Sequence, residues 1–517
     1  MFNRLSVICS GLLCMLLLSS FEGGCGSKQS DVKKTGETVG STNKTTQTAP
    51  VSPDGFRTEH DLLGDKQIPN NAFYGVQTAR ALENFQISGV TTKDYPDLVD
   101  AFVIVKLAAI RANSEAGAIP KDVLDAVEKA CSEVLAGKYH DQFVVDLYQG
   151  GAGTSANMNV NEVLANIALE LSGKKKGDYK SIEPHDHLNL SQSTNDSYPT
   201  SLKVAMILMN NRLMPQLDSL ILSFETKGKE FENVLKMGRT EMQDAVPMTL
   251  GQEFNAFASQ LRGSVDELKR AEEGLYVINM GGTAIGTKLN AEKGFVENCA
   301  KHLSQITGKK FVPAKDLIAA TSDLSAFVTF SGALNNLAVR LSKIASDLIL
   351  LESGPRAGLN EIDLPALQPG SSIMPGKVNP VIPELVNVVA FRVMANDVAV
   401  TIAAKSGQLQ LNAYEPLALS SIIESEKILT NMMRTFRLKC IDGITANEKT
   451  LSDYIERSVG IVTALNPILG YDKASELAKE ALETNKGILE LVREKKLLTE
   501  DQIKDIMDPK KMTGQTK

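Results

Sequence analysis

The sequence is poor in the residues that build metal sites and disulfide frameworks. It contains only five histidines and six cysteines among 517 residues. Three cysteines lie near the N-terminus, at Cys9, Cys14 and Cys25, and the other three are far apart. This spacing is typical neither of a disulfide framework nor of a zinc site. Only His185 and His187 are close together, and such a pair in a loop more often forms hydrogen bonds. We therefore expect no metal site.

An excess of positive charge is also missing. The chain has 55 Lys and Arg against 62 Asp and Glu, which gives a net charge of −7 and a pI near 5.5. Because no basic block offsets this balance, we expect no nucleic-acid partner. An anionic substrate would have to be held by local cations. The hydrophobic content of 43% is ordinary for a globular protein, and the length allows two or three domains.

The N-terminus has the pattern of an export signal. Arg4 precedes an apolar run from Leu5 to Leu18, which is too short to span a bilayer comfortably but suits a secretory signal. Cys25 resembles the lipid-acceptor cysteine of bacterial lipoproteins, although Glu22 stands where those signals prefer an apolar residue. Lipid attachment at Cys25 and simple cleavage both stay open. Either one predicts an exported protein, periplasmic or anchored to a membrane by lipid, and the alternative is a cytoplasmic one.

The rest of the chain divides by composition. Residues 26–54 are rich in Ser, Thr, Lys and Gly, so we expect a disordered tether after a signal in residues 1–25. Residues 55–193 are mixed and predict an N-terminal domain, with one helix near residues 95–116. Residues 194–446 predict a central helical-bundle domain, and residues 447–517 a small helical C-terminal domain.

Long helices dominate the predicted central domain. Apolar residues with helical periodicity recur at residues 198–232, 249–277, 324–352, 383–406 and 416–440. A 30-residue helix is about 45 Å long, more than a compact monomeric domain needs. The stretches at residues 324–352 and 383–406 carry apolar or small residues on more than one face, so they require neighbours on several sides. We expect an oligomeric bundle; a large monomeric α domain is the alternative.

Four segments interrupt this scaffold with small hydroxyl and amide residues. We predict polar loops at residues 150–162, 191–200, 237–253 and 370–380, the last reading "GSSIMPGKVNP". Helix caps and turns would explain one or two such residues in each loop. The "GGAGTS" stretch lacks the Gly-Lys-Ser/Thr of a phosphate-binding loop, so a nucleotide site is not expected.

The chemistry of these loops suits a small dicarboxylate. Hydroxyl, amide and glycine-exposed backbone N–H groups donate hydrogen bonds, and one lysine neutralises a carboxylate. The same donors could stabilise the doubly charged aci-carboxylate that forms when a proton leaves the carbon beside a carboxylate. Ser371, with Lys377 nearby and glycines around it, is the candidate for the base that removes this proton.

These motifs resemble the fumarase/aspartase superfamily. The similarity runs in the same order through "EHDLLGDKQIPNNAFYGVQT", "YQGGAGTSANMNVNEVLAN", "SQSTNDSYPT", "GRTEMQDAVPMTLGQEF", "GSSIMPGKVNP" and "DGITAN". The resemblance implies a mainly α, three-domain fold and a homotetramer with a central twenty-helix bundle. It also implies active sites that combine loops from three subunits, and no redox cofactor. Activation by a divalent cation stays open.

The resemblance also assigns roles by position. Ser371 matches the family's general base, and Lys377 and Asn379 match the residues that bind one substrate carboxylate. The carboxylate that becomes the aci-carboxylate is bound at the positions of Thr154, Ser193, Thr194 and Ser372. Asn195 and Thr240 match residues near the departing group.

Departures from the fumarase pattern favour ammonia over water as the leaving group. Ala152 replaces a serine, residues 183–186 read Glu-Pro-His-Asp where fumarases have His-Pro-Asn-Asp, and Glu241 replaces a histidine. An anionic Glu241 would attract an ammonium group, unless it faces solvent. We therefore expect an ammonia-lyase that converts L-aspartate to fumarate. Fumarate hydratase is the first alternative, and a non-catalytic protein with the lyase fold is the second.

Overall fold

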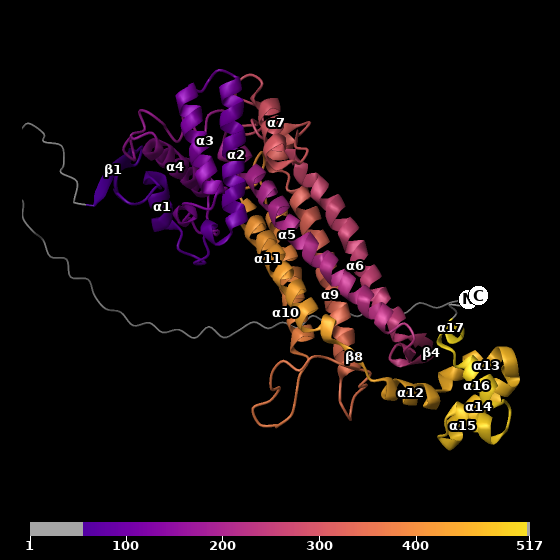
Figure 1. Cartoon of the computed structure of the whole chain (residues 1–517). Helices are drawn as coiled ribbons and strands as arrows, with labels where there is room; N and C mark the ends of the chain where they lie inside the picture. The colour runs from indigo at the N-terminus through magenta and orange to yellow at the C-terminus, as the bar shows by residue number, and fades with distance from the viewer. Residues whose placement is uncertain (1–54, 514–517) are drawn as a thin grey trace, which may run out of the picture. The chain divides into compact units, whose positions relative to one another are not determined.

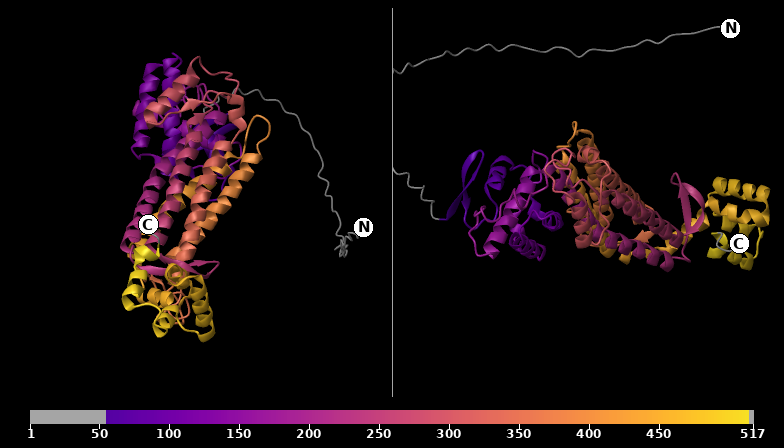
Figure 2. Two further views of the ribbon diagram at one scale, coloured as in Figure 1. Left: turned by 90° about the vertical axis from the view of Figure 1, so that its right-hand side faces the viewer. Right: turned by 90° about the horizontal axis from the view of Figure 1, so that it is seen from above.

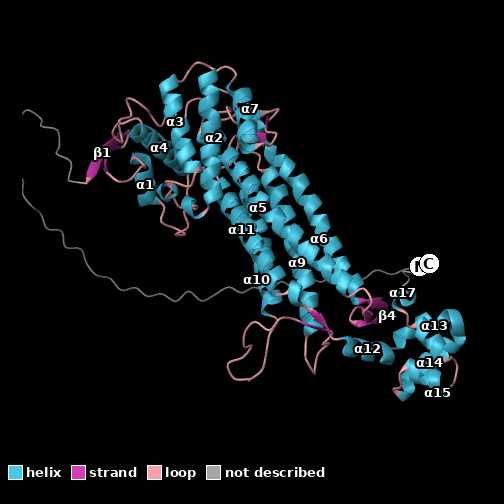
Figure 3. Cartoon of the chain, in the orientation of Figure 1, coloured by secondary structure: helices cyan, strands magenta, loops and turns pink. Residues whose placement is uncertain are grey.

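The computed structural model describes residues 55–513 of the chain, so the predicted signal and tether lie outside the described residues. The described residues belong to one compact unit. Helices make up most of it, and the strands are short (Figure 3). In the part of the chain that the structure describes, the strands form four sheets of two strands each. A mainly helical fold is therefore confirmed.

The N-terminal elements pack around an apolar core to which several helices contribute. The elements are β1 (Phe56–Asp61), β2 (Gly64–Pro69), α1 (Val76–Asn84), α2 (Pro96–Glu115), α3 (Lys121–Leu135) and α4 (Thr154–Leu171). β1 and β2 form an antiparallel hairpin. Helix α2, predicted at residues 95–116, is buried along nearly its whole length and packs against α3 and the long helix α5 (Thr194–Glu230). This contact ties the N-terminal elements to the bundle.

Five long helices run side by side and form the bundle (Figures 1 and 2). They are α5, α6 (Leu250–Glu273), α9 (Ser325–Glu352), α10 (Val381–Lys405) and α11 (Glu415–Lys439). Each lies within a few residues of its predicted range, so the periodicity located them correctly. Phe224 of α5 stacks edge-on with Phe257 and Phe436 and packs beside Phe254, which closes one part of the shared core.

Short elements connect the bundle helices. These are β3 (Leu235–Thr240), β4 (Gln243–Thr249), β5 (Val277–Ile278), α7 (Phe295–Thr307), β6 (Val312–Pro313), α8 (Leu317–Ser322), β7 (Ile362–Asp363) and β8 (Thr445–Ala446). β3 and β4 form an antiparallel hairpin, and β5 and β6 pair in parallel.

The last six helices have their own apolar cluster. They are α12 (Glu448–Arg457), α13 (Val462–Leu469), α14 (Tyr471–Thr484), α15 (Ile488–Glu494), α16 (Glu500–Ile506) and α17 (Pro509–Met512). Leu465, Leu477 and Ile488 lie at the centre of this cluster. Helix α12 contacts β3, so this region packs against the β3–β4 hairpin. The domain boundaries at residues 193/194 and 446/447 stay a prediction.

Three of the four predicted loops are largely regular structure, so that prediction was wrong in part. Helix α4 begins at Thr154 inside the first segment, α5 begins at Thr194 inside the second, and the third is the β3–β4 hairpin followed by α6. Hydroxyl and amide residues are favoured both in loops and in the first turn of a helix, so composition alone could not separate these cases. Only residues 370–380 form the loop that was predicted, before α10.

Helix α10 exposes an apolar face. Leu385, Val388, Phe391, Val398 and Ile402 are all at least 37% exposed. Among the described residues, α10 is the one helix whose length and composition would allow it to cross a membrane. It packs instead between α9 and α11, with its remaining face uncovered. Covering such a face with another protein surface removes apolar area from water, which is favourable.

Candidate active site

The first turns of α4 and α5 lie against each other. Gly153, with φ +87°, precedes α4, and a Cβ atom there would lie 2.4 Å from the ring of Tyr198 in α5. Only glycine combines this positive φ with this close approach. Asn157 of α4 donates a hydrogen bond to the Thr194 hydroxyl at 3.3 Å. Thr154 and Thr194, predicted as binders of one carboxylate, therefore begin two helices that are in contact.

Ser193 caps α5. Its Oγ accepts from the backbone N–H of Asn195 at 3.2 Å, and its own N–H donates to the Asp196 carboxylate at 2.9 Å. The sequence Ser-Thr-Asn-Asp is thus a capping box. The cap fixes Ser193 at the positive end of a 37-residue helix, where anions are favoured.

Asp196 is a buried residue of this site that the sequence analysis missed. Its carboxylate also accepts from the N–H groups of Gly281 at 3.0 Å and Thr283 at 2.9 Å. Burial raises the pKa of Asp196 to about 7, against the effect of its backbone donors. Asp196 thereby ties residues 281–283 to the start of α5. The serine three positions before Asp196 was the signal that could have identified it.

The predicted residues differ in how they are engaged. Asn195 donates from its side chain to the carbonyl of Ala284 at 2.7 Å, and the Thr154 hydroxyl donates to the carbonyl of Gly151 at 2.7 Å. Thr154 would therefore have to rotate to donate to a ligand. Of the three hydroxyls here, those of Ser193 and Thr194 act as acceptors, and their protons have no acceptor among the described residues.

Residues 370–380 form a loop, called the serine loop here, in which two backbone N–H groups donate to the Ser371 hydroxyl. Its Oγ accepts from the backbone N–H of Ile373 at 3.2 Å and of Met374 at 3.0 Å. The base of the loop is closed by the Gly370 N–H, which donates to the Lys377 carbonyl at 2.6 Å. Asn379 closes it further by donating to the Gly370 carbonyl at 2.8 Å. Asn379, predicted as a ligand residue, thus also holds the loop together.

Ser372 and Lys377 are exposed on this loop, and neither makes a side-chain hydrogen bond or ion pair with a described residue. Both remain available to a ligand. An unpaired lysine beside two hydroxyls is suited to hold a carboxylate as a point charge.

Thr240 and Glu241 lie at the tip of the β3–β4 hairpin. Glu241 and Met242 form its two-residue turn, with φ of 52° and 64°, and Glu241 is exposed without a side-chain partner among the described residues. The hairpin stem is fixed by the buried Glu361, whose carboxylate lies 2.5 Å from Arg239 Nη1 and 3.0 Å from Lys236 Nζ. The tip therefore projects from a rigid base.

The structure thus brings the ten predicted residues together in three groups. Residues 154 and 193–195 form one group, residues 240 and 241 the second, and residues 371–379 the third. No hydrogen bond or ion pair between described side chains joins one group to another. The described residues thus fasten each group separately.

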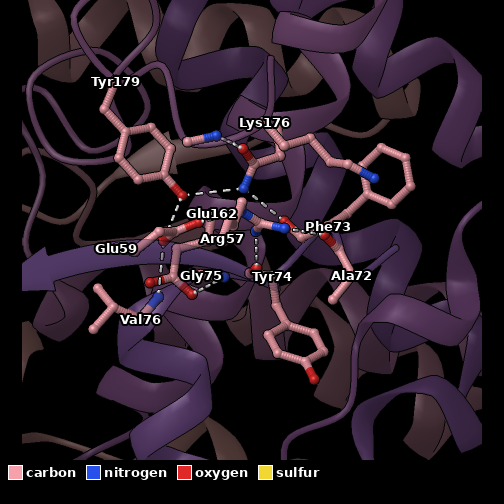
Figure 4. Close-up of polar contacts among 12 residues, drawn as sticks. Arg57, Glu59, Ala72, Phe73, Tyr74, Gly75, Val76, Glu162, Lys176 and Tyr179 are labelled. Atoms are coloured by element: carbon pink, nitrogen blue, oxygen red, sulfur yellow. Dashed lines mark hydrogen bonds and ion pairs between the residues drawn. The ribbon is translucent and has the colours of Figure 1, made fainter. Parts of the chain in front are cut away.

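A second polar cluster lies among the N-terminal elements β1, α1 and α4, and the sequence pattern did not predict it. Glu162 of α4 accepts from the N–H groups of Gly75, Gln77 and Thr78 and from the Thr78 hydroxyl. Burial raises the pKa of Glu162 to about 7, whereas these four donors favour the charged form. Glu59, held by Arg57 and by the Tyr179 hydroxyl, lies next to it (Figure 4). Glu59 also accepts from the Val76 N–H at 3.0 Å, so Glu162 holds α4, and Glu59 holds β1, against the start of α1.

The histidines near this cluster form hydrogen bonds. His185 Nε2 lies 2.8 Å from Gln77 Nε2, and His187 Nδ1 accepts from the Glu183 N–H at 2.9 Å. His185 and Glu183 line a cavity of about 390 Å³. In the part of the chain that the structure describes, no group of three His, Cys, Asp or Glu side chains could hold a metal ion.

Known protein families and relatives match nearly all of the described chain. Residues 64–395 match the family model described as "Lyase", and residues 461–514 match "Fumarase C C-terminus". An aspartate ammonia-lyase of Pseudomonas aeruginosa is 54% identical over 457 residues, 88% of this chain and 96% of that protein.

Two solved structures share the fold. A "fumarate lyase:delta crystallin" of Brucella melitensis bound to cobalt is 49% identical, with a TM-score of 0.86 over 89% of this chain and 99% of that one. A class II fumarase of Schistosoma mansoni is 36% identical, with a TM-score of 0.83 over 89% of this chain and 100% of that one.

The closure of the serine loop is testable with Gly370→Ala. A Cβ atom there would lie 2.8 Å from the Lys377 carbonyl oxygen and 2.9 Å from the Asn379 nitrogen, so the loop base must open. We expect the amides of Ile373 and Met374 to exchange with deuterium at least about tenfold faster. Gly376→Asn is the matched control, because position 376 has φ +81° and open space, which asparagine tolerates. Unchanged exchange in Gly370→Ala would contradict the closure described here.

Proposed function

Because the chain belongs to the fumarase/aspartase superfamily of lyases, we propose a mechanism in which its three groups of site residues remove ammonia from L-aspartate. Its function is that of an aspartate ammonia-lyase, supported by relatives at about 50% identity over 88% of the chain. The products are fumarate and ammonia. The reaction is redox-neutral overall, so the proposal requires no redox cofactor. The proposal makes no statement on activation by a divalent cation.

The position of Ser371 carries the mechanism. A serine hydroxyl is a weak base because its alkoxide is unstable in water. Two backbone N–H groups already point at Ser371 Oγ, and such donors stabilise the alkoxide more than the neutral hydroxyl. Lys377 adds a positive charge on the same loop. In this mechanism the Ser371 alkoxide takes the proton from the carbon beside the side-chain carboxylate of aspartate.

The charge that develops next needs donors already in place. As the proton leaves, its electron pair moves into the adjacent carboxylate, which becomes the doubly charged aci-carboxylate. The hydroxyls of Ser193 and Thr194, at the N-terminus of α5, are suited to stabilise it, together with Thr154 and Ser372. Lys377 and Asn379 then bind the other carboxylate, which keeps its charge throughout.

Collapse of the aci-carboxylate expels the amine. Its electron pair forms the carbon–carbon double bond of fumarate, and the C–N bond breaks on the opposite face. Asn195, Thr240 and Glu241 are placed near the departing nitrogen in this proposal. The exposed carboxylate of Glu241 favours an ammonium group and disfavours a third anion. That preference separates the proposal from fumarate hydratase, whose leaving group is water.

The proposed site requires more than one chain. Its three groups are not joined within the chain, and α10 leaves an apolar face uncovered next to the serine loop in sequence. We propose a homotetramer in which these faces meet and in which each active site takes one group from each of three subunits. The long helices then cover one another's apolar faces, as the bundle pattern of the sequence requires.

Ser371→Ala tests the mechanism. Positioned proton transfer contributes roughly 10²–10⁴-fold, so kcat should fall at least about a hundredfold with little change in KM. Lys377→Ala is the contrasting variant, because it removes a charge used by substrate and transition state alike and should also raise KM. The assay follows fumarate absorbance from L-aspartate and, separately, from L-malate. A Ser371→Ala enzyme that keeps a tenth of wild-type kcat would exclude Ser371 as the base, and faster wild-type turnover of malate would favour the hydratase.

The tetramer is tested on the face of α10. Phe391 is 59% exposed in the single chain, so Phe391→Asp should place a charge in the proposed interface. Light scattering should show dissociation into smaller species, with helical content kept and activity lost. Tyr471→Asp, at a position 75% exposed on α14, is the control and should stay tetrameric. An active wild-type monomer would refute both the assembly and the shared site.

Export is a separate proposal that rests on the N-terminal sequence. We propose that the export signal is removed from the mature protein. The protein is then either periplasmic after cleavage near residue 25, or held at a membrane by lipid on Cys25 as its first residue. Mass spectrometry of native protein should find a chain that begins near Cys25. Cys25→Ser distinguishes the two forms, because it should release only a lipid-anchored protein from membranes. An intact Met1 on cytosolic protein would refute export.

A further inference from the structure

A buried chain of hydrogen bonds leads from α2 to the proposed site. Lys106 of α2 is 1% exposed, and its Nζ donates to Asn189 Oδ1 at 3.1 Å and to Gln192 Oε1 at 2.9 Å. Burial lowers the pKa of Lys106 to about 7, and the negative charge of Asp196 opposes this shift. The neutral amine keeps two N–H groups, one for each acceptor. The direction of these hydrogen bonds is therefore the same in both protonation states.

Asn189 is locked in one orientation. Its Oδ1 accepts three hydrogen bonds, from Lys106 Nζ, Asn157 Nδ2 and Asn161 Nδ2, each 3.1 Å long. If the amide were reversed, its NH₂ group would face three donors. Unmade hydrogen bonds of buried polar groups cost roughly 1–3 kcal/mol each, so the reversed form is strongly disfavoured.

The fixed Asn189 in turn fixes Asn157. One N–H of Asn157 Nδ2 is directed to Asn189 Oδ1, and the other to Thr194 Oγ1 at 3.3 Å. On its other side, Asn157 Oδ1 lies 3.0 Å from the Ser197 hydroxyl, whose single proton is shared with the Ser193 carbonyl at 2.9 Å, so it is Asn189 that sets the orientation of Asn157. Asn157 therefore presents a donor, and not an acceptor, to Thr194.

The orientation of Asn157 determines where the Thr194 hydroxyl can direct its proton. A threonine hydroxyl has one proton, and its oxygen already accepts from Asn157. No described residue accepts the Thr194 proton, although the residue is only 9% exposed. With Asn157 reversed, its oxygen would accept that proton and withdraw it from the ligand. The orientation of Asn157 thus decides whether Thr194 can donate to a carboxylate.

We propose that Lys106 is a positioning residue that acts through Asn189 and Asn157 to direct the Thr194 hydroxyl as a donor toward the substrate carboxylate. The proposal rests on the proposed function, in which Thr194 stabilises the aci-carboxylate. Lys106 itself touches no substrate. A purely structural role would instead make Lys106 a satisfied buried cation with no specific effect on Thr194.

A double-mutant cycle between Lys106→Met and Thr194→Val separates the two roles. Loss of a donor to a developing oxyanion costs about 10²–10³-fold, so Thr194→Val should lower kcat about a hundredfold with little change in KM. Lys106→Met should lower kcat about tenfold. If Lys106 acts through Thr194, the double variant should be no slower than Thr194→Val alone. A double variant whose loss equals the product of the two single losses would overturn the proposal.

Lys203→Met is the matched control. Lys203 of α5 is also buried, at 8% exposure, and donates to the Val277 carbonyl at 2.7 Å, away from Asn157 and Asn189. Its effect on kcat should multiply with that of Thr194→Val.

Thermal unfolding and light scattering establish that each variant is folded and assembled. If Lys106→Met does not fold, Lys106→Gln replaces it in the double-mutant cycle with Thr194→Val. The shorter glutamine side chain cannot donate to both Asn189 and Gln192 as the lysine does. The outcome is judged as for Lys106→Met. A wild-type enzyme inactive on L-aspartate would refute the proposed function itself, before any variant is compared.

Discussion

The absence of a side chain at Gly153 is the constraint on which the first part of the site depends. The first turn of α4 can lie against the ring of Tyr198 only because no Cβ atom stands between them. That approach sets Asn157 against Thr194 and aligns the starts of two helices whose N-terminal ends favour anions. The buried Asp196 completes the arrangement by holding residues 281–283 onto the same end of α5. The hydrogen bonds that hold this arrangement are thus mostly between backbone groups and polar side chains.

The other two groups are built by different means. The serine loop is closed on itself by the Gly370 N–H and the Asn379 side chain, and the hairpin tip is held by the buried ion pairs of Glu361. Each of these groups is therefore fastened within its own chain, without contacts to the other groups. Such a division suits a site that forms on assembly, because each chain contributes a finished part and few residues must be ordered when chains meet.

The sequence predicted the bundle helices closely, whereas its assignment of site residues stays a prediction. Helical periodicity located five helices to within a few residues, since long amphipathic segments have a strong repeating signal. The same reasoning took residues 154–162 for a loop, because asparagines buried on all sides of α4 break the apolar repeat. Lys106 and Asp196 were missed for another reason. Lys106 binds residues 83 and 86 positions away, and no local pattern in the sequence predicts such a contact.

The capping residues show a further limit of the sequence. Ser193 and Thr249 have the same local role, each accepting a backbone hydrogen bond at the start of a helix. Only Ser193 lies where two helix starts meet. Residue type and spacing therefore identify candidate donors, whereas the packing of α4 on α5 decides which of them lie close to one another.

The hairpin that carries Glu241 has a consequence for how such proteins change over time. The side chains that fix it, at Lys236, Arg239 and Glu361, all precede or lie away from the turn, and Glu241 itself contributes nothing to that fastening. Replacement of the residue at the tip would therefore leave the stem intact. In the proposed mechanism Glu241 faces the departing nitrogen, so single mutations there would change the leaving group at almost no expense in stability, apart from the modest strain of a positive φ. Under that proposal, substrate preference and thermal stability are free to evolve independently at this position.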